Sequence, residues 1–166
     1  MTEDFLIKNE VKEYLESARL YCEFMESNVE IDSIEFLKEV RQLLLTLYQK
    51  GLYFPLHDGD SDEDTDDLFG DNYFAVLKLI GKKVGKTDFY LHIYDPTNPS
   101  DEKPVGGSLT DDLGDIYRDL KRALLQLDTD SEAAKEDALF SLNFLFRSHY
   151  GAHIINGLYA IHFFLQ

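Results

Sequence analysis

Apolar residues at helical spacing constrain the fold of this chain more than any other feature. In the stretch SLTDDLGDIYRDLKRALLQL they return every three or four positions and form one continuous stripe. A stripe of this period buries one face of an α-helix against other helices. Similar stripes recur along most of the chain, so the pattern predicts an all-α protein. The stripe positions in this stretch are Leu109, Leu113, Ile116, Tyr117, Leu120, Leu124 and Leu127.

The stripes predict a single-domain helical bundle of about six helices over residues 1–166. Capping patterns mark three of the helix starts, because a short polar side chain can accept a hydrogen bond from the first free backbone amides. Gly151 either kinks the fifth helix or separates it from a sixth. The expected helices cover about residues 4–27, 32–51, 68–82, 108–127, 129–150 and 152–165, and the capping pairs are Asp32 with Glu35, Ser108 with Asp111, and Thr129 with Glu132.

The segments between the helices are expected to be loops, and the sequence shows no internal repeat and no persuasive strand pair. Residues 57–67 form an acidic loop between helices 2 and 3; its spacing fits no EF-hand, so a solvated, flexible loop is expected. Residues 95–107 form a loop rich in proline and glycine, and the basic run 81–86 reads as a solvated turn. The segment DFYLHIYDP is ambiguous; if it is extended, Tyr90, His92 and Tyr94 could line a groove.

Charge and cysteine content narrow the surroundings in which the chain can work. With 32 acidic and 16 basic residues, the net charge is −16, which repels nucleic-acid phosphates and anionic membranes and leaves a basic partner or a bound cation as options. Cys22 is the single cysteine, so no internal disulfide can form, and its place on an apolar stripe suggests a buried, inert thiol. The amino-terminal stretch does not read as a signal peptide, and the apolar end IINGLYAIHFFLQ is too short to span a bilayer. A cytoplasmic protein is therefore expected.

Three aspartates follow one edge of the stripe in the stretch quoted first. At about 100° per residue, Asp112, Asp115 and Asp119 lie beside the apolar face, whereas Asp111 faces solvent. The next helix follows after a short turn, which predicts an antiparallel hairpin. In such a hairpin, residues that are equally far from the turn along the two helices lie side by side, and this count places Asp112 near His149. The same count places Asp119 too far from His149, so Arg41 or Arg19 becomes its expected partner.

Two interpretations of this polar cluster remain open. If the fifth helix continues through Gly151, His153 and Asn156 extend the row of His149, and a divalent metal could bind there. The candidate metal ligands are Asp112, Asp115, His149 and His153, and the candidate structural cluster is Asp119, Arg41 and Asn156. We favour a purely structural role, in which each histidine donates to a carboxylate, because the HxxxH spacing is weak evidence alone. The sequence indicates no catalytic residues and no cofactor other than this possible metal.

Three fragments resemble an uncharacterised bacterial family that carries the domain-of-unknown-function number 5063. They are SLTDDLGDIYRDLKRALLQLD, FRSHYGAHIINGLYAIH and, more weakly, LYQKGLYFPL. The family has a D-D-L-x-D-I-Y-x-D-L-K helix and an H-aromatic-G-x-H segment, which here are Asp111 to Lys121 and His149 to His153. Tyr150 stands where the family often has Trp. The resemblance implies an all-helical soluble fold and no chemistry, and the family's gene neighbourhood near a ribonuclease-D-like exonuclease hints at a partner in RNA processing.

The leading hypothesis is therefore an interaction or adaptor protein that binds a macromolecular partner, and no enzyme activity is assigned. An acidic surface could dock onto a basic nucleic-acid-processing enzyme or mimic nucleic acid. The alternative is a metal-dependent enzyme or metal-binding protein built on the Asp/His cluster. A small-molecule sensor with a pocket behind Tyr90 to Tyr94 is a third possibility.

Overall fold

The computed structural model describes residues 2–57 and 72–166, and it is predominantly helical with a single domain. The acidic run expected as a loop over residues 57–67 lies outside these residues from position 58 onward. Within the described residues there are seven helices and one two-stranded sheet. They are α1 (Thr2–Leu6), α2 (Asn9–Glu26), α3 (Ser33–Tyr53), α4 (Asn72–Val84), β1 (Phe89–His92), β2 (Val105–Ser108), α5 (Leu109–Leu127), α6 (Glu132–Ser148) and α7 (Tyr150–Phe164).

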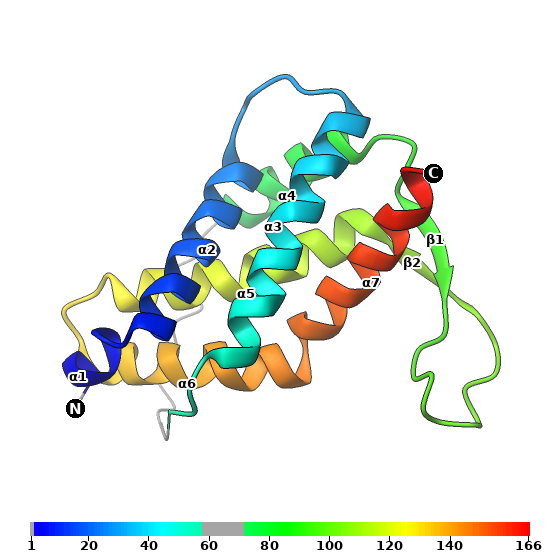
Figure 1. The fold of residues 1–166 in the computed structure, drawn as a ribbon. Helices are drawn as coiled ribbons and strands as arrows, with labels where there is room; N and C mark the ends of the chain where they lie inside the picture. Colours follow the sequence, from blue (N-terminus) through cyan, green and yellow to red (C-terminus); the bar gives the residue numbers. More distant parts are fainter. Residues whose placement is uncertain (1, 58–71) are drawn as a thin grey trace.

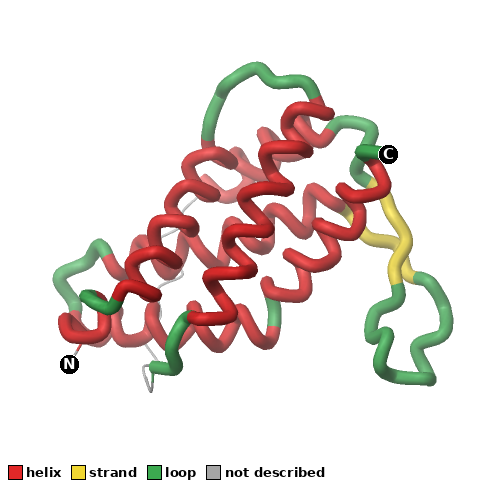
Figure 2. Tube along the Cα trace, in the orientation of Figure 1, coloured by secondary structure: helices red, strands yellow, loops and turns green. Residues whose placement is uncertain are grey.

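Helix α5 is the centre of the bundle. It packs against α2, α4, α6 and α7, while α3 packs against α2, α4 and α7. Figure 1 shows α5 running behind α2 and α3, with the hairpin of β1 and β2 at the end of the molecule where the carboxyl terminus lies. The loop between the two strands extends away from the helices (Figure 2). Because four helices surround α5, its apolar stripe is buried from Leu109 to Leu124, as its sequence predicts, and only Leu127 at its end is partly exposed.

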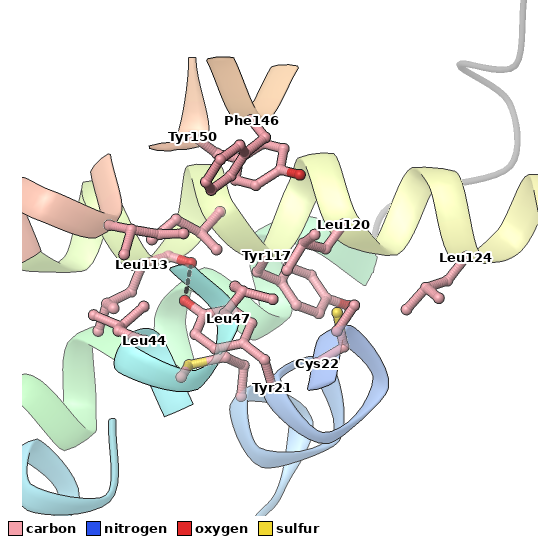
Figure 3. Packing of buried hydrophobic residues seen from close by; sticks show 14 of the residues in the cluster. Tyr21, Cys22, Leu44, Leu47, Leu113, Tyr117, Leu120, Leu124, Phe146 and Tyr150 are labelled. Carbon is pink, nitrogen blue, oxygen red and sulfur yellow. Dashed lines mark hydrogen bonds between the residues drawn. The ribbon is translucent and has the colours of Figure 1, made fainter. Parts of the chain in front are cut away.

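Tyrosines carry much of the core and tie distant helices together. The Tyr21 hydroxyl donates to the carbonyl oxygen of Leu113 at 2.9 Å, a bond drawn in Figure 3. The Tyr14 hydroxyl bonds that of Tyr150, which in turn donates to the carbonyl oxygen of Leu142 at 2.6 Å. A buried hydroxyl without such a partner would lower the free energy of unfolding by about 1 to 3 kcal/mol. These bonds therefore allow full burial of polar aromatic side chains between α2, α5, α6 and α7.

The helix starts agree with the capping patterns at two of three positions. Asp32 accepts hydrogen bonds from the amides of Ile34 and Glu35, and Ser108 accepts one from the amide of Asp111. The prediction of Thr129 as the third cap is wrong: Ser131 caps α6, while the Thr129 hydroxyl donates to the carbonyl of Gln126. The first predicted helix is also broken, because α1 ends at Leu6 and α2 begins at Asn9.

The long C-terminal helix is two helices, α6 and α7, joined at His149. The backbone of His149 has φ −141° and ψ −89°, which is not helical. Gly151 makes this joint possible, because a Cβ there would lie 2.0 Å from the carbonyl oxygen of Phe146. Contacts of that length do not occur between a side chain and a backbone oxygen. The chain direction therefore changes between the two histidines.

The ambiguous segment at residues 88–96 contains strand β1, and the absence of a strand pair is a wrong prediction. Strand β1 pairs with β2 in antiparallel register, with Phe89 opposite Ser108 and His92 opposite Val105. Strand β2 lies at the end of the predicted proline and glycine loop, in the sequence VGGS, which carries no strand pattern. Its glycine at position 107 leaves room for the Tyr90 ring, since a Cβ there would lie 2.5 Å from that ring.

The basic run at residues 81–86 is a solvated turn only in part. Lys83 is buried, and its ammonium group donates to the carbonyl oxygens of Ser27 at 2.7 Å and Phe24 at 3.2 Å. This lysine therefore satisfies free carbonyl groups at the end of α2. Burial lowers its pKa below the usual range.

Among the described residues, none of the helices combines the length and apolar character needed to cross a bilayer.

Candidate functional site: an Asp/His cluster beside a cavity

The site is built on the acidic edge of α5, and the start of this helix is doubly capped. Besides the Ser108 cap, the Asp88 carboxylate accepts the amide of Thr110 at 2.7 Å and the hydroxyl of Ser108 at 3.1 Å. Asp88 directly precedes β1, so the same residue holds the hairpin onto α5. The helix then presents Asp112, Asp115 and Asp119 at the edge of its buried face, as the helical period of about 100° per residue predicts.

His149 pairs with Asp119, which corrects the sequence-based assignment. Its Nδ1 lies 2.6 Å from Asp119 Oδ2, and an ionised carboxylate can only accept, so the imidazole donates. The prediction that Asp119 lies too far from His149 assumed that α6 runs antiparallel beside α5 over its full length. At about 1.5 Å per residue, α6 is about twice as long as the part of α5 that follows Asp119, so counting equal steps from the turn does not describe this contact.

His153 pairs with Asp112, whereas the residue count from the turn predicted that Asp112 lies near His149. Its Nδ1 lies 2.7 Å from Asp112 Oδ1, and its Nε2 lies 3.6 Å from Asp115 Oδ2. The hydrogen bond that His153 donates to Asp112, together with the charges of Asp112 and Asp115, raises the pKa of His153 against the opposing effect of burial. The change of direction at the α6–α7 joint places His153 over the first turn of α5, so each histidine has its own aspartate.

Arg118 completes the charge balance on α5, in place of the arginines expected from other helices. Its guanidinium lies 2.8 Å from Asp115 Oδ1 and 3.5 Å from Asp119 Oδ1. The expected pairing of Asp119 with Arg41 or Arg19 is therefore wrong; Arg19 lies 3.9 Å from Asp128 instead. The i, i+3 spacing of Asp115 and Arg118 is a known helix ion-pair pattern, so the sequence did contain this signal.

Tyr90 is the second partner of Asp112 and comes from strand β1. Its hydroxyl donates to Asp112 Oδ2 at 2.5 Å, while Oδ1 accepts from His153. Both oxygens of this buried carboxylate are thus occupied by hydrogen bonds from two other elements. Burial and the adjacent carboxylate raise the pKa of the Tyr90 hydroxyl, which remains a donor. The hairpin, α5 and α7 therefore meet at Asp112.

A cavity of about 770 Å³ opens beside this cluster, between the hairpin, the start of α5 and the start of α7. The sequence predicted that Tyr90, His92 and Tyr94 could line a groove if their segment is extended. Strand β1 is extended, and all three residues line the cavity. Asn156 also lines it, next to His153. Of the described residues, no lysine or arginine contributes to its wall, whereas Asp95, Asp111 and Asp112 do. The cavity is therefore aromatic and negatively charged.

Three of the four candidate metal ligands are brought together. One donor atom each from Asp115, His149 and His153 lie within 4.8 Å of one another. The two imidazole rings are 4.8 Å apart and nearly perpendicular. Asp112 stands apart from this group because both of its oxygens are already used. The described residues thus place a two-histidine, one-carboxylate group at the cavity, with two further aspartates behind the histidines.

Cys22, the one cysteine of the sequence, is a structural residue of the core. Cys22 is 2% exposed and packs in the core, and burial raises the pKa of its thiol far above the usual range. A thiol in that state is a poor nucleophile and a poor metal ligand, because both roles need the thiolate. This agrees with the expectation of an inert cysteine.

Comparison with known proteins gives a family and a fold. The model of a domain of unknown function, DUF5063, matches residues 6–166. The chain is also similar to a crystal structure of protein BF1032 from Bacteroides fragilis, with a TM-score of 0.80 and 19% identity over 97% of this chain and 98% of that chain. The TM-score shows a shared fold. No curated protein matches the sequence significantly.

Proposed function

The chain belongs to the DUF5063 family of domains of unknown function, and we propose that it works by binding a basic protein partner. The partner would place a lysine or arginine side chain in the cavity between the hairpin and α7. The observation that carries this proposal is the cavity wall, in which aromatic rings and carboxylates surround the opening and no described residue is a lysine or arginine.

Charge supports a cationic occupant. Asp111 is exposed and Asp95 is partly exposed at the cavity, and the net charge of −16 extends the attraction over the rest of the molecule. Such a field speeds the encounter with a basic surface and disfavours anionic ones. Direct binding of nucleic acid is not expected for the same reason. A nucleic-acid-processing enzyme is one class of protein that carries a basic surface of the required kind.

The exposed aromatic rings support the same occupant. Tyr94 is 80% exposed and Phe89 is 67% exposed, although both line the cavity. A guanidinium or ammonium group over such a ring gains about 0.5 to 1 kcal/mol at an exposed site, and more when water is excluded. Large aromatic residues are also frequent at the energetic centres of protein interfaces. Rings left exposed beside carboxylates are therefore suited to a basic side chain.

We place this function in the cytoplasm. A single cysteine that is buried as a thiol is compatible with a reducing compartment.

Fluorescence anisotropy with labelled peptides tests the proposal. A lysine- and arginine-rich peptide should bind at low salt, and binding should weaken as salt rises, whereas a glutamate-rich peptide of equal length should not bind. The variant Tyr94→Ala should weaken binding of the basic peptide about 2- to 5-fold, because one cation–π contact is lost. Its exposed position makes a folding defect improbable, and circular dichroism checks this.

A charge-matched control separates the cavity from general acidity. The double variant Asp95→Asn with Asp111→Asn and the double variant Glu10→Gln with Glu39→Gln remove the same charge, but Glu10 and Glu39 are exposed residues of α2 and α3 outside the cavity. The variant at Asp95 and Asp111 should weaken binding of the basic peptide more than the variant at Glu10 and Glu39, although both remove the same charge. Equal weakening by both would show attraction to the whole surface and would contradict a cavity-bound side chain.

A further inference from the structure

We propose that Asp115, His149 and His153 bind one divalent first-row transition metal ion, such as zinc. Asp112 and Asp119 would act as outer carboxylates that orient the two histidines. This inference does not depend on the partner proposed above, because it concerns three side chains of this chain, of which His149 and His153 line the cavity, and it needs no other protein.

The hydrogen bonds of the histidines prepare both rings for metal binding. His149 donates Nδ1–H to Asp119, and His153 donates Nδ1–H to Asp112, each at 2.7 Å or less. A neutral imidazole that donates from Nδ1 carries its free lone pair on Nε2. Metal-bound histidines are commonly held by a carboxylate in this way, which fixes the ring and raises its basicity. The structure shows this arrangement twice, on two histidines four positions apart.

The geometry of the three ligands is close to that of a bound ion. Donor atoms on one zinc ion lie about 3.3 Å apart, since each is about 2.0 to 2.1 Å from the metal. Here the donor atoms lie within 4.8 Å, and Asp115 Oδ2 is already 3.6 Å from His153 Nε2. His149 is the most exposed of the three, with 36% of its side chain accessible, so a small rotation of this ring can close the group.

Local charge also favours a cation at this position. Five aspartates surround the group or line the adjacent cavity, namely Asp95, Asp111, Asp112, Asp115 and Asp119. Among the described residues, Arg118 is the one arginine or lysine that forms an ion pair with them. With both histidines neutral, these groups sum to about −4, and a divalent ion would leave about −2. The cavity would thus remain suited to a cationic side chain after metal binding.

Three protein ligands leave at least one coordination position open toward the cavity. Structural zinc sites fill all four positions with protein ligands, whereas sites with three ligands keep a water molecule. Two imidazoles and a carboxylate suit zinc and iron(II) more than calcium or magnesium, which prefer oxygen ligands alone. The proposed ion would therefore be accessible to small molecules.

Isothermal titration calorimetry with zinc chloride tests this site on chelator-treated full-length protein. We expect one equivalent to bind with micromolar or tighter affinity. Replacement by cobalt(II) should give visible absorption bands typical of nitrogen and oxygen ligands. His149→Ala should weaken zinc binding at least 100-fold, and Asp119→Asn should weaken it about 10- to 100-fold, as is typical for an outer carboxylate.

Two controls keep the result interpretable. His162→Ala removes an exposed histidine of α7 that is outside the group, so this variant should still bind one equivalent. His149 is partly exposed, so its alanine variant should fold, and its thermal midpoint without metal should equal that of the native chain. Absence of stoichiometric binding to the native protein would overturn the proposal. Binding that His149→Ala and His153→Ala leave unchanged would overturn it as well, because the metal would then be held elsewhere.

Discussion

The buried face of α5 and its acidic edge both join distant segments by hydrogen bonds, yet they leave different atoms free. On the buried face, Tyr21 from α2 donates to the carbonyl oxygen of Leu113, and both residues are fully buried. On the edge, Asp119 accepts from His149, whose other ring nitrogen has no hydrogen bond among those described. The bond of Tyr21 satisfies a buried carbonyl oxygen inside the core. The bond of His149 leaves the lone pair on its other ring nitrogen available at the cavity.

This difference teaches that the two faces contribute to different properties. Burial of apolar surface is worth about 25 cal/mol per Å², so the packed face provides most of the stability. An ion pair with a largely accessible partner, such as that of Arg118 with 42% of its side chain exposed, contributes little, about 0 to 1 kcal/mol. We therefore expect substitutions on the buried face to change the free energy of unfolding, and substitutions on the edge to change binding.

The largest expected loss follows Leu113→Ala on the buried face. Leu113 is fully buried against the tyrosines of the core (Figure 3), so its removal leaves a cavity. We expect the free energy of unfolding to fall by about 3 kcal/mol, measured by urea titration. Leu52→Ala, at an exposed leucine of α3, is the control and should cost less than about 0.5 kcal/mol. Similar losses in both variants would show that α5 is not the centre of the core.

Gly151→Ala should break both faces at once. The added Cβ would meet the Phe146 carbonyl oxygen at 2.0 Å, so the α6–α7 joint must open. We expect a loss of about 2 to 3 kcal/mol in urea unfolding. Because the joint also carries His149, zinc binding should fail in the same variant. Gly157→Ala is a useful comparison, since its Cβ would lie 3.3 Å from a flexible leucine end and should be tolerated better.

Tyr21→Phe removes a single hydrogen bond from the buried face. The carbonyl oxygen of Leu113 loses its side-chain donor in a place without access to water, and we expect a loss of about 1 kcal/mol. Differential scanning calorimetry measures the change. Tyr94→Phe, which removes a hydroxyl from an 80% exposed ring, should leave stability unchanged. An unchanged midpoint for Tyr21→Phe would mean that the bond to Leu113 makes no net contribution.

Asp119→Asn should have the smallest effect on stability. An asparagine oxygen can still accept from His149, so the hydrogen bond survives while the charge is lost. We expect the free energy of unfolding to change by less than about 1 kcal/mol. Urea unfolding of the metal-free protein is the measurement. A loss equal to that of Leu113→Ala would erase the distinction between the two faces of the helix.

Local patterns predicted the helices well because they depend on neighbours in the chain. The stripe from Leu109 to Leu124 is buried as expected, and Ser108 caps its helix. The edge position of Asp112, Asp115 and Asp119 also followed from the helical period alone. The same local approach failed at β2, since the sequence VGGS has little strand propensity and is extended because β1 lies beside it. Lys83 gave no sign of burial, because its carbonyl partners come from α2.

The sequence by itself determined that α5 is an amphipathic helix with carboxylates along one edge, because periodicity and capping act within a few residues. Only the tertiary structure decided which histidine meets which aspartate. That outcome depends on the joint at Gly151, where the Phe146 carbonyl leaves no room for a side chain. A count of residues along the chain assumes straight, parallel helices, and a single change of direction assigned His149 to Asp119 and His153 to Asp112.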